Sequence, residues 1–227
     1  WVNTLGITYN RSVSDNISDG VLDTGTEGTK TRSYWQSTWL PGGDDNNRLT
    51  AVLEQTRETF KQSATDISFG DPNRDLAQTN RALVGEYLHA WNKLWRLSLS
   101  ARHDANEDFE DANTYRAGIL YDQLQAQGWQ LRASYGTGVK NPTFVERYGY
   151  YEVGGPAFVG NPNLSPEKSS SWELGTTLKT PDDLLRLDLT YFNERLEDEI
   201  NGFYFDPSLG DMGANTAINL DGTSKRD

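Results

Sequence analysis

The stretch WRLSLSA (residues 95–101) alternates apolar with polar residues at every position, and WQLRASY (129–135) and LRLDLTY (185–191) share the pattern. A period of two places the apolar side chains of a β-strand on one face and the polar side chains on the other. A register shift of one residue would turn Arg132 or Arg186 toward the apolar side. If that side is lipid, each arginine near the middle of a bilayer costs about 2–4 kcal/mol. The pattern therefore predicts strands whose register is strongly fixed.

The rest of the chain extends this pattern to ten strands. They are predicted at 1–13, 30–40, 48–60, 80–91, 94–103, 114–124, 129–139, 170–178, 184–196 and 214–224. Long links (14–29, 61–79, 104–113, 140–169 and 197–213) alternate with short links (41–47, 92–93, 125–128 and 179–183), and the long ones are expected to be loops. All long links then fall at one end of the sheet, as in outer-membrane barrels, whereas the Greek-key crossings of a β-sandwich do not require this. The sequence predicts an all-β fold, an antiparallel up-and-down transmembrane β-barrel.

Aromatic residues are sorted by strand end. At the short-link end lie Trp1, Trp39, Trp91, Trp95 and Trp129, and toward the long-link end lie Tyr9, Tyr115, Tyr135, Trp172 and Tyr191. Two aromatic rows with leucine, isoleucine and alanine between them are typical of a lipid-facing band with interfacial girdles. The opposite phase carries charged and polar residues of both signs, predicted to line a wet interior: Arg32, Tyr34, Gln36, Glu54, Glu86, Arg96, Arg116, Arg132, Glu173, Arg186 and Asp188.

Composition excludes several classes of function. The chain has a net charge of −12, which argues against a nucleic acid as partner because phosphate binding needs clustered cations. Cysteine is absent, so disulfides and thiolate metal sites are impossible. The spacing of Asp104, Asn106 and Asp108 starts like a calcium loop but lacks its glycine and final glutamate. His89 and His103 have no nearby nucleophile in the pattern. We predict no catalytic, cofactor or metal site.

Two motifs late in the chain carry a family resemblance. The first is YGTGVKNPTF (135–144) and the second is GNPNLSPEKSSSWELG (160–175). In this order, with a long external loop between them, they resemble the barrel region of TonB-dependent outer-membrane receptors, nearest to vitamin B12 receptors and the smaller siderophore receptors. Weaker similarity continues through 191–193 and 218–222.

The resemblance implies a barrel of about 22 strands whose lumen holds a plug. It implies a receptor in the bacterial outer membrane, surrounded by lipid, that takes up a bulky scarce solute such as an iron–siderophore complex or cobalamin with energy from TonB. Residues 1–227 are then one partial barrel domain. The plug, the TonB box, the signal peptide and the C-terminal strands are expected to lie outside these residues. Ten strands of so wide a barrel curve too gently to close, so we expect an open curved sheet whose first and last strands do not pair.

Candidate solute contacts are aromatic and polar residues of the predicted loops, although packing among the loops explains them equally well: Phe144, Arg147, Tyr148, Tyr150, Tyr151 and Tyr204. Three other functions stay open. A passive porin would need an open lumen, a membrane-embedded phospholipase or protease would need a catalytic cluster, and a soluble extracellular β-domain would cover Leu97, Leu131 and Leu187 with a second layer.

Overall fold

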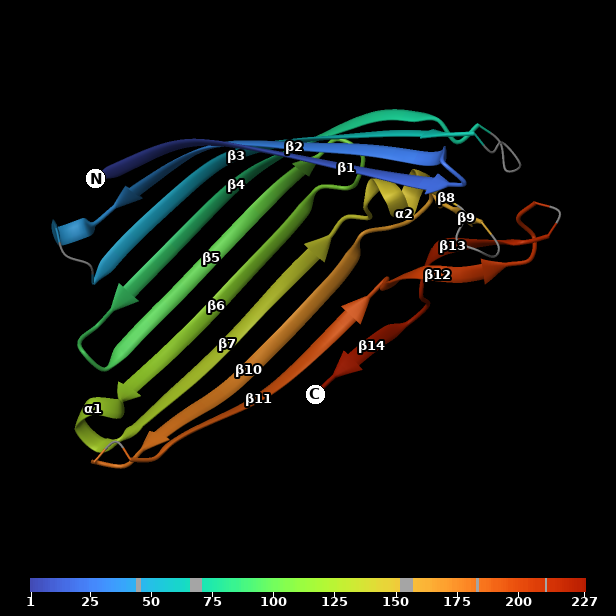
Figure 1. Cartoon of the computed structure of the whole chain (residues 1–227). Coiled ribbons are helices and arrows are strands. Elements are labelled where there is room, and N and C mark those ends of the chain that lie inside the picture. The colour runs from blue at the N-terminus through green and yellow to red at the C-terminus, as the bar shows by residue number, and fades with distance from the viewer. Residues whose placement is uncertain (44–45, 66–70, 152–156, 183, 211) are drawn as a thin grey trace.

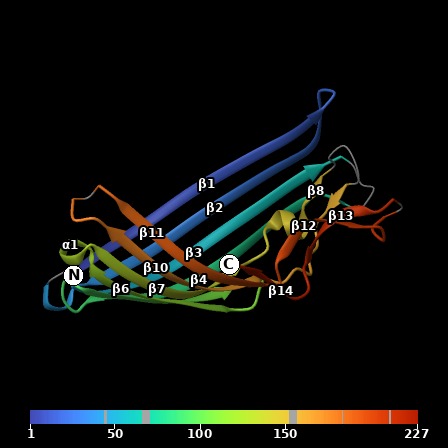
Figure 2. The same ribbon diagram turned by 90° about the horizontal axis from the view of Figure 1, so that it is seen from below.

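The fold, seen in a computed structural model, is a ten-stranded antiparallel sheet that curves into an open trough (Figures 1 and 2). The structure describes residues 1–43, 46–65, 71–151, 157–182, 184–210 and 212–227. In spatial order, the sheet contains β1 (Val2–Ser18), β2 (Val21–Trp39), β3 (Asn47–Ala64), β4 (Arg74–Ala90), β5 (Trp95–Asn106), β6 (Ala112–Gln123), β7 (Trp129–Lys140), β10 (Glu167–Lys179), β11 (Arg186–Glu197) and β14 (Thr223–Arg226).

A second, four-stranded sheet lies at the long-link end of the trough, with the order β12-β13-β9-β8 (Figure 1). Its strands are β8 (Tyr150–Tyr151), β9 (Phe158–Val159), β12 (Ile200–Asp206) and β13 (Ala214–Asn219). The helices are short: η1 (Pro41–Gly43), α1 (Leu124–Gln127) and α2 (Phe144–Tyr148). No helix in the described ranges has the length and apolarity needed to cross a membrane.

The main sheet is open, as predicted. Strands β1 and β14 stand at its two ends, and within the described ranges β1 pairs only with β2 and β14 only with β11. Each edge therefore presents one row of backbone N–H and C=O groups without a ladder partner, which a membrane would not tolerate in isolation.

The convex face of the main sheet is apolar and bare. Leu53, Leu83 and Leu131 are cross-strand residues of the apolar phase and are 50%, 54% and 48% exposed. The soluble-domain alternative requires a layer over Leu97, Leu131 and Leu187, yet Leu187 is 44% exposed and Leu97 is only part-buried. In a soluble β-domain these leucines would form the core and a second layer of the protein would bury them. The described part of the chain therefore contradicts the soluble β-domain.

The two aromatic rows form as contacts between neighbouring strands. At the short-turn end the ring centroids of Tyr121 lie 4.5 Å from Trp95 and 5.2 Å from Trp129. Toward the loop end Tyr115 lies 6.0 Å from Tyr135, and Trp172 lies 5.3 Å from Tyr191. Residues of the predicted loop-end row thus meet directly, and at the short-turn end Tyr121, which the prediction did not include, contacts both Trp95 and Trp129.

The prediction of long irregular loops was wrong in part. Residues 14–29 are not a loop: β1 and β2 continue to a two-residue turn at Asp19-Gly20, where φ is 49° and 80°. Positive φ at both central residues is the signature of a tight hairpin turn whose twist suits the flanking strands. Links 61–79 and 104–113 are likewise shortened by longer strands, and 140–169 and 197–213 contain α2, β8, β9 and β12.

The tenth predicted strand, 214–224, was also wrong as a single strand. Residues 214–219 are β13 of the small sheet, where Ala214 and Ala217 are fully buried. The chain then turns at Gly222, which has a φ of 95°, and only β14 joins the main sheet beside β11. Residues 214–219 therefore belong to the core of the small sheet rather than to a strand of the main sheet.

Candidate functional site

Helix α2 sits at the loop end of the trough on its concave side (Figure 1). It begins with a capping box, in which Thr143 Oγ1 accepts from Glu146 N at 3.2 Å and the Glu146 carboxylate accepts from Thr143 N at 2.7 Å. The reciprocal bonds satisfy two of the free N–H groups at the start of the helix. The Phe144 ring stacks on Phe60 of β3 with centroids 5.7 Å apart, an aromatic pair of the kind worth about 0.5–1.5 kcal/mol.

A buried glutamine fastens the same segment to the wall. Gln62 is 4% exposed; its Oε1 accepts from Tyr150 N at 3.1 Å, and its Nε2 donates to Pro72 O at 3.2 Å. One side chain of β3 thus holds β8 and the approach to β4 together. The segment after β7 is therefore a fixed feature of the trough.

Arg147 joins α2 to the turn between β5 and β6. Its guanidinium lies 4.6 Å from the centre of the Phe109 ring and 4.7 Å from that of Tyr148, and Nη1 lies 3.7 Å from Asp108 Oδ2. The Arg147 side chain is only 11% exposed. Arg147 is thus committed to aromatic faces and a carboxylate within the protein.

The small sheet has its own apolar core. Phe158, Leu164 and Ala217 are buried, and Tyr151 stacks on Phe158 with centroids 4.8 Å apart. Burial raises the pKa of Tyr151 above its ordinary value. Phe203 of β12 also packs against Phe158, with ring centroids 5.5 Å apart.

The motif at 160–175 meets the weaker similarity at 218–222 beside this core. Asn219 Nδ2 donates to Ser165 O at 3.0 Å and Asn219 Oδ1 accepts from Ser165 N at 2.9 Å. Asn161 Nδ2 donates to Ala217 O at 3.0 Å. The motif at 160–175 is therefore held to β13 by hydrogen bonds from side chains of both segments.

The structure separates the six candidate contacts into two groups. Tyr150 is 4% exposed, and Phe144, Arg147, Tyr148 and Tyr151 are part-buried by the packing just described. Tyr204, on the edge strand β12, is 44% exposed, and its neighbours Phe203 and Phe205 are 60% and 46% exposed. Five of the six are thus gathered around α2 and β8, while Tyr204 presents an open aromatic surface.

A polar cavity of 570 Å³ lies between α2 and the concave face. Its rim includes Phe144 and Val145, and its floor is formed mainly by hydroxyl and amide side chains of β1–β4, among them Thr29, Thr56, Thr59, Gln78 and Asn80. No sequence pattern predicted this cavity, but the Thr143–Glu146 capping box could have revealed the helix over it.

Charged residues in the cavity are paired. Glu54 accepts from Arg32 Nε at 2.6 Å and from Arg102 Nη2 at 3.1 Å, and Lys30 Nζ lies 2.7 Å from Glu58. Arg102 also donates to Asp104 at 2.7 Å, so the carboxylate considered for a calcium loop already has a partner. The polar phase thus faces the concave side as predicted.

The Lys140–Glu167 ion pair at the end of β7 is expected to make the stability of the protein depend on pH. The Glu167 carboxylate, 2.9 Å from Nζ, raises the pKa of Lys140 above its ordinary value of 10.5, with Glu146 adding to the effect. Because the folded pKa is raised, the stabilisation is complete below pH 10.5 and is lost as pH rises through the folded pKa. Wild type is expected to resist urea better than Lys140→Gln at pH 9, with the gap closing at strongly alkaline pH. A gap that stays constant would contradict the pairing.

Adding one methyl group at Gly160 is expected to destabilise the contact between this residue and α2. A Cβ there would lie 2.5 Å from Tyr148 N and 2.6 Å from Arg147 C, both backbone atoms of α2 that cannot swing away. Gly160→Ala is expected to break the bonds from Gly160 N to Gly149 O and from Asn161 N to Glu146 O, at a cost of about 1–3 kcal/mol. Hydrogen exchange of these amides measures the loss. Gly202→Ala is the control, since nothing lies within 4 Å of its Cβ position; equal exchange in both variants would refute the account.

Comparison with known proteins identifies the fold. The sequence matches the family described as TonB dependent receptor-like, beta-barrel over residues 1–226. The siderophore receptor PirA of Pseudomonas aeruginosa superposes with a TM-score of 0.72 at 16% identity, over 98% of this chain and 45% of that one. The hemophore receptor HasR of Serratia marcescens gives 0.67 at 14% identity, over 89% and 38%. The copper transporter OprC gives 0.68 at 14% identity, over 97% and 39%.

The chain spans less than half the length of these solved structures. At such identities the superposition establishes the fold, while the family match covers nearly every residue. The matched family and its structural neighbours are receptors and transporters rather than enzymes. With its open ten-stranded sheet, its bare apolar convex face and the two motifs paired as neighbouring strands β7 and β10, the chain belongs to the family of TonB-dependent receptor β-barrels.

Proposed function

We propose that this chain supplies part of the wall and several external loops of an outer-membrane receptor that imports a bulky scarce nutrient with energy from TonB. The match to the receptor family over residues 1–226 carries the proposal. The bare apolar convex face supports a place in lipid, and the two unpaired edges support membership of a wider barrel completed by other strands. The plug and the segment that contacts TonB belong to other parts of such a receptor.

The cargo we infer is a preassembled complex, such as an iron–siderophore or a cobalamin-like molecule, rather than a bare metal ion. Soft or borderline ligands are scarce, since the sequence has no cysteine, one methionine and two histidines. Both histidines, His89 and His103, belong to the convex phase and bond to Asn47 and Asn113. The concave side instead offers hydroxyl, amide and paired charged groups, which suit hydrogen bonding to a large polar solute.

Within the chain, we propose that cargo meets the exposed aromatic edge of β12, with Tyr204 at its centre, and the rim of the polar cavity at Phe144. Arg147 and Tyr150 then hold the loop sheet in place, because both are packed against protein groups. Tyr148, beside Arg147, and Tyr151, stacked on Phe158, complete the set of candidate contacts. Tyr204→Ala is the variant most suited to separating cargo binding from folding.

The experiment is uptake of ⁵⁵Fe-labelled siderophores and labelled cobalamin by cells with and without the intact gene, together with membrane fractionation. We expect the protein in the outer-membrane fraction, and uptake of one labelled complex that disappears on deletion and when a protonophore collapses the inner-membrane gradient. Uptake that survives the protonophore would favour the passive-channel alternative. Recovery of the intact protein in the soluble fraction would overturn the proposal.

A further inference from the structure

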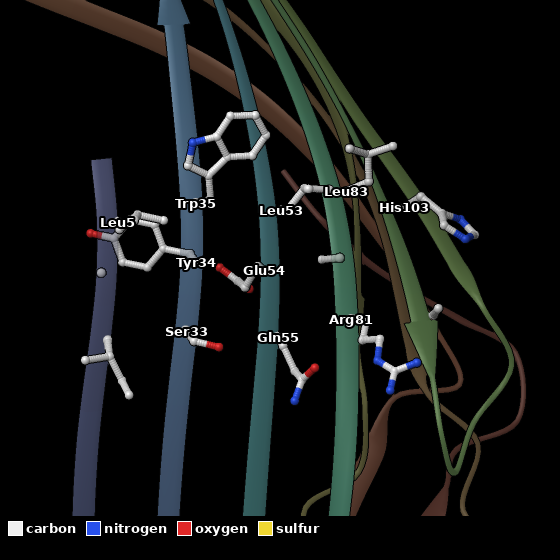
Figure 3. A pocket seen from close by; sticks show the side chains of 14 residues that line it. Leu5, Ser33, Tyr34, Trp35, Leu53, Glu54, Gln55, Arg81, Leu83 and His103 are labelled. Atoms are coloured by element: carbon white, nitrogen blue, oxygen red, sulfur yellow. The ribbon is translucent and has the colours of Figure 1, made fainter. Parts of the chain in front are cut away.

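The convex face carries a groove of 760 Å³ that crosses β1 to β5 (Figure 3). One row of the groove is apolar: Trp35, Leu53 and Leu83 are cross-strand neighbours and are 40%, 50% and 54% exposed. The next row toward the loop end is polar, with Gln55 opposite both Ser33 and Arg81. Figure 3 shows the two rows one beside the other. Toward the loop end, the lining of the groove thus changes from the apolar row to a polar row that carries the positive charge of Arg81.

Two arginine side chains, Arg57 and Arg81, stand at the polar end of the groove. Arg81 lines the groove, and Arg57 is opposite Thr79, so the two project from adjacent strands on the same face, two residues apart in register. Both are exposed, and within the described ranges neither side chain makes an ion pair or a hydrogen bond. The nearby carboxylate of Glu107 already accepts from Thr79 N at 2.8 Å. Glu54 and Glu58 belong to the concave phase, where Arg32 and Lys30 pair with them.

The arrangement recurs elsewhere around the wall. Arg195 of β11 lies directly opposite Lys225 of β14, in the same outward phase as Tyr191 and on its loop side. Both are exposed, and neither has an ion pair or hydrogen bond in the part of the chain that the structure describes. Glu197, two residues further along β11, lies opposite Lys168. Unpaired cations beside the outer aromatic row are notable because the chain as a whole carries a net charge of −12.

We propose that Arg57 and Arg81 bind the phosphate of a membrane lipid in the leaflet nearest the loops, with its acyl chains lying in the groove over Leu53 and Leu83. Guanidinium groups bind phosphate oxygens with short, charge-assisted hydrogen bonds, often two at a time. The apolar row supplies the surface that an acyl chain would cover and that a free phosphate ion would leave bare. Recurrence at Arg195 and Lys225 fits a leaflet that surrounds the wall better than a single soluble ligand.

The proposal rests on the proposed membrane location of the barrel, and the test keeps the two apart. The complete receptor, purified in dodecyl maltoside, is mixed with bisphosphorylated lipid A, with the same lipid after removal of both phosphates, or with inorganic phosphate, and bound adducts are counted by native mass spectrometry. The variant is Arg57→Gln with Arg81→Gln. The control is Lys93→Gln with Arg96→Gln, which removes the same charge at the short-turn end.

Wild type and control are expected to retain bisphosphorylated lipid A, and the double variant to lose about tenfold or more of its affinity, because two sets of charge-assisted hydrogen bonds are removed. Equal retention of the dephosphorylated lipid, equal retention by the double variant, or arginine-dependent binding of inorganic phosphate alone would each overturn the proposal. Cargo uptake is expected to be unchanged in the double variant, since both arginines belong to the convex phase. If the wild-type receptor retains lipid A but shows no energised uptake of any labelled cargo, the proposed function is refuted and the lipid site is not.

Discussion

Replacing Leu99 by arginine is expected to lower the free energy of unfolding from a bilayer by about 2–4 kcal/mol, the largest single effect we expect on the convex face. Leu99 lies midway along β5 between the Trp95 girdle and His103, and it is 40% exposed with no protein layer over it in the described ranges. An arginine there would have to place its charge in hydrocarbon or pull water and headgroups toward it. Urea unfolding from vesicles measures the change.

The neighbouring residue provides the matched control. Ser98 is one position away, on the concave phase, and is exposed. Ser98→Arg adds the same side chain to a wet surface, so its effect should stay within about 0.5 kcal/mol. Similar losses for the two variants would show that β5 does not separate lipid from water.

Replacing Gln62 by leucine is expected to have the largest effect in the loop region. The substitution leaves the N–H of Tyr150 and the carbonyl of Pro72 without their partner at a site where Gln62 is 4% exposed. Losing each of these two buried hydrogen bonds costs about 1–3 kcal/mol, so a total of about 2–5 kcal/mol is expected. The segment carrying α2 and β8 should then exchange its amide hydrogens faster and become sensitive to protease.

Gln78→Leu tests whether the effect is specific to the two Gln62 hydrogen bonds, called here the Gln62 tether, or would follow the loss of any glutamine on the concave face. Gln78 is part-buried and donates one hydrogen bond, from Nε2 to Glu58 at 2.9 Å, while Glu58 keeps Lys30 as a partner. Its loss should cost less than about 1 kcal/mol and leave the exchange of Tyr150 N unchanged. If Gln62→Leu leaves the protection of α2 and β8 intact, the tether is not what fixes the segment.

Sequence patterns closely predicted the strands whose convex face is apolar. The strand predicted at 129–139 is Trp129–Lys140 in the structure, and the one predicted at 184–196 is Arg186–Glu197. The pattern works there because one face meets an apolar environment and the other a wet one, so each position is constrained to one chemistry. The same logic predicted the concave placement of Arg32 and Glu54.

Prediction failed where that asymmetry ends. Beyond Tyr9 the first hairpin is mostly polar on both phases, so residues 14–29 carried no period of two although their backbone continues in register. At 214–219 a strand was predicted for the barrel, but these residues form β13 of the small sheet, where Ala214 and Ala217 are buried. The partners of the candidate contacts were also out of reach, because Gln62 meets Tyr150 across 88 residues of sequence and only the fold brings them together.

The most direct test of the lipid-facing assignment is a nitroxide scan of residues 96–101 in the receptor reconstituted into vesicles, which the absence of native cysteine in this chain makes straightforward. Accessibility to oxygen, which concentrates in hydrocarbon, is compared with accessibility to a water-soluble nickel chelate. The account predicts oxygen-rich, nickel-poor signals at 97, 99 and 101 and the opposite at 96, 98 and 100. Odd positions shielded from both reagents, or as open to nickel as the even ones, would contradict it.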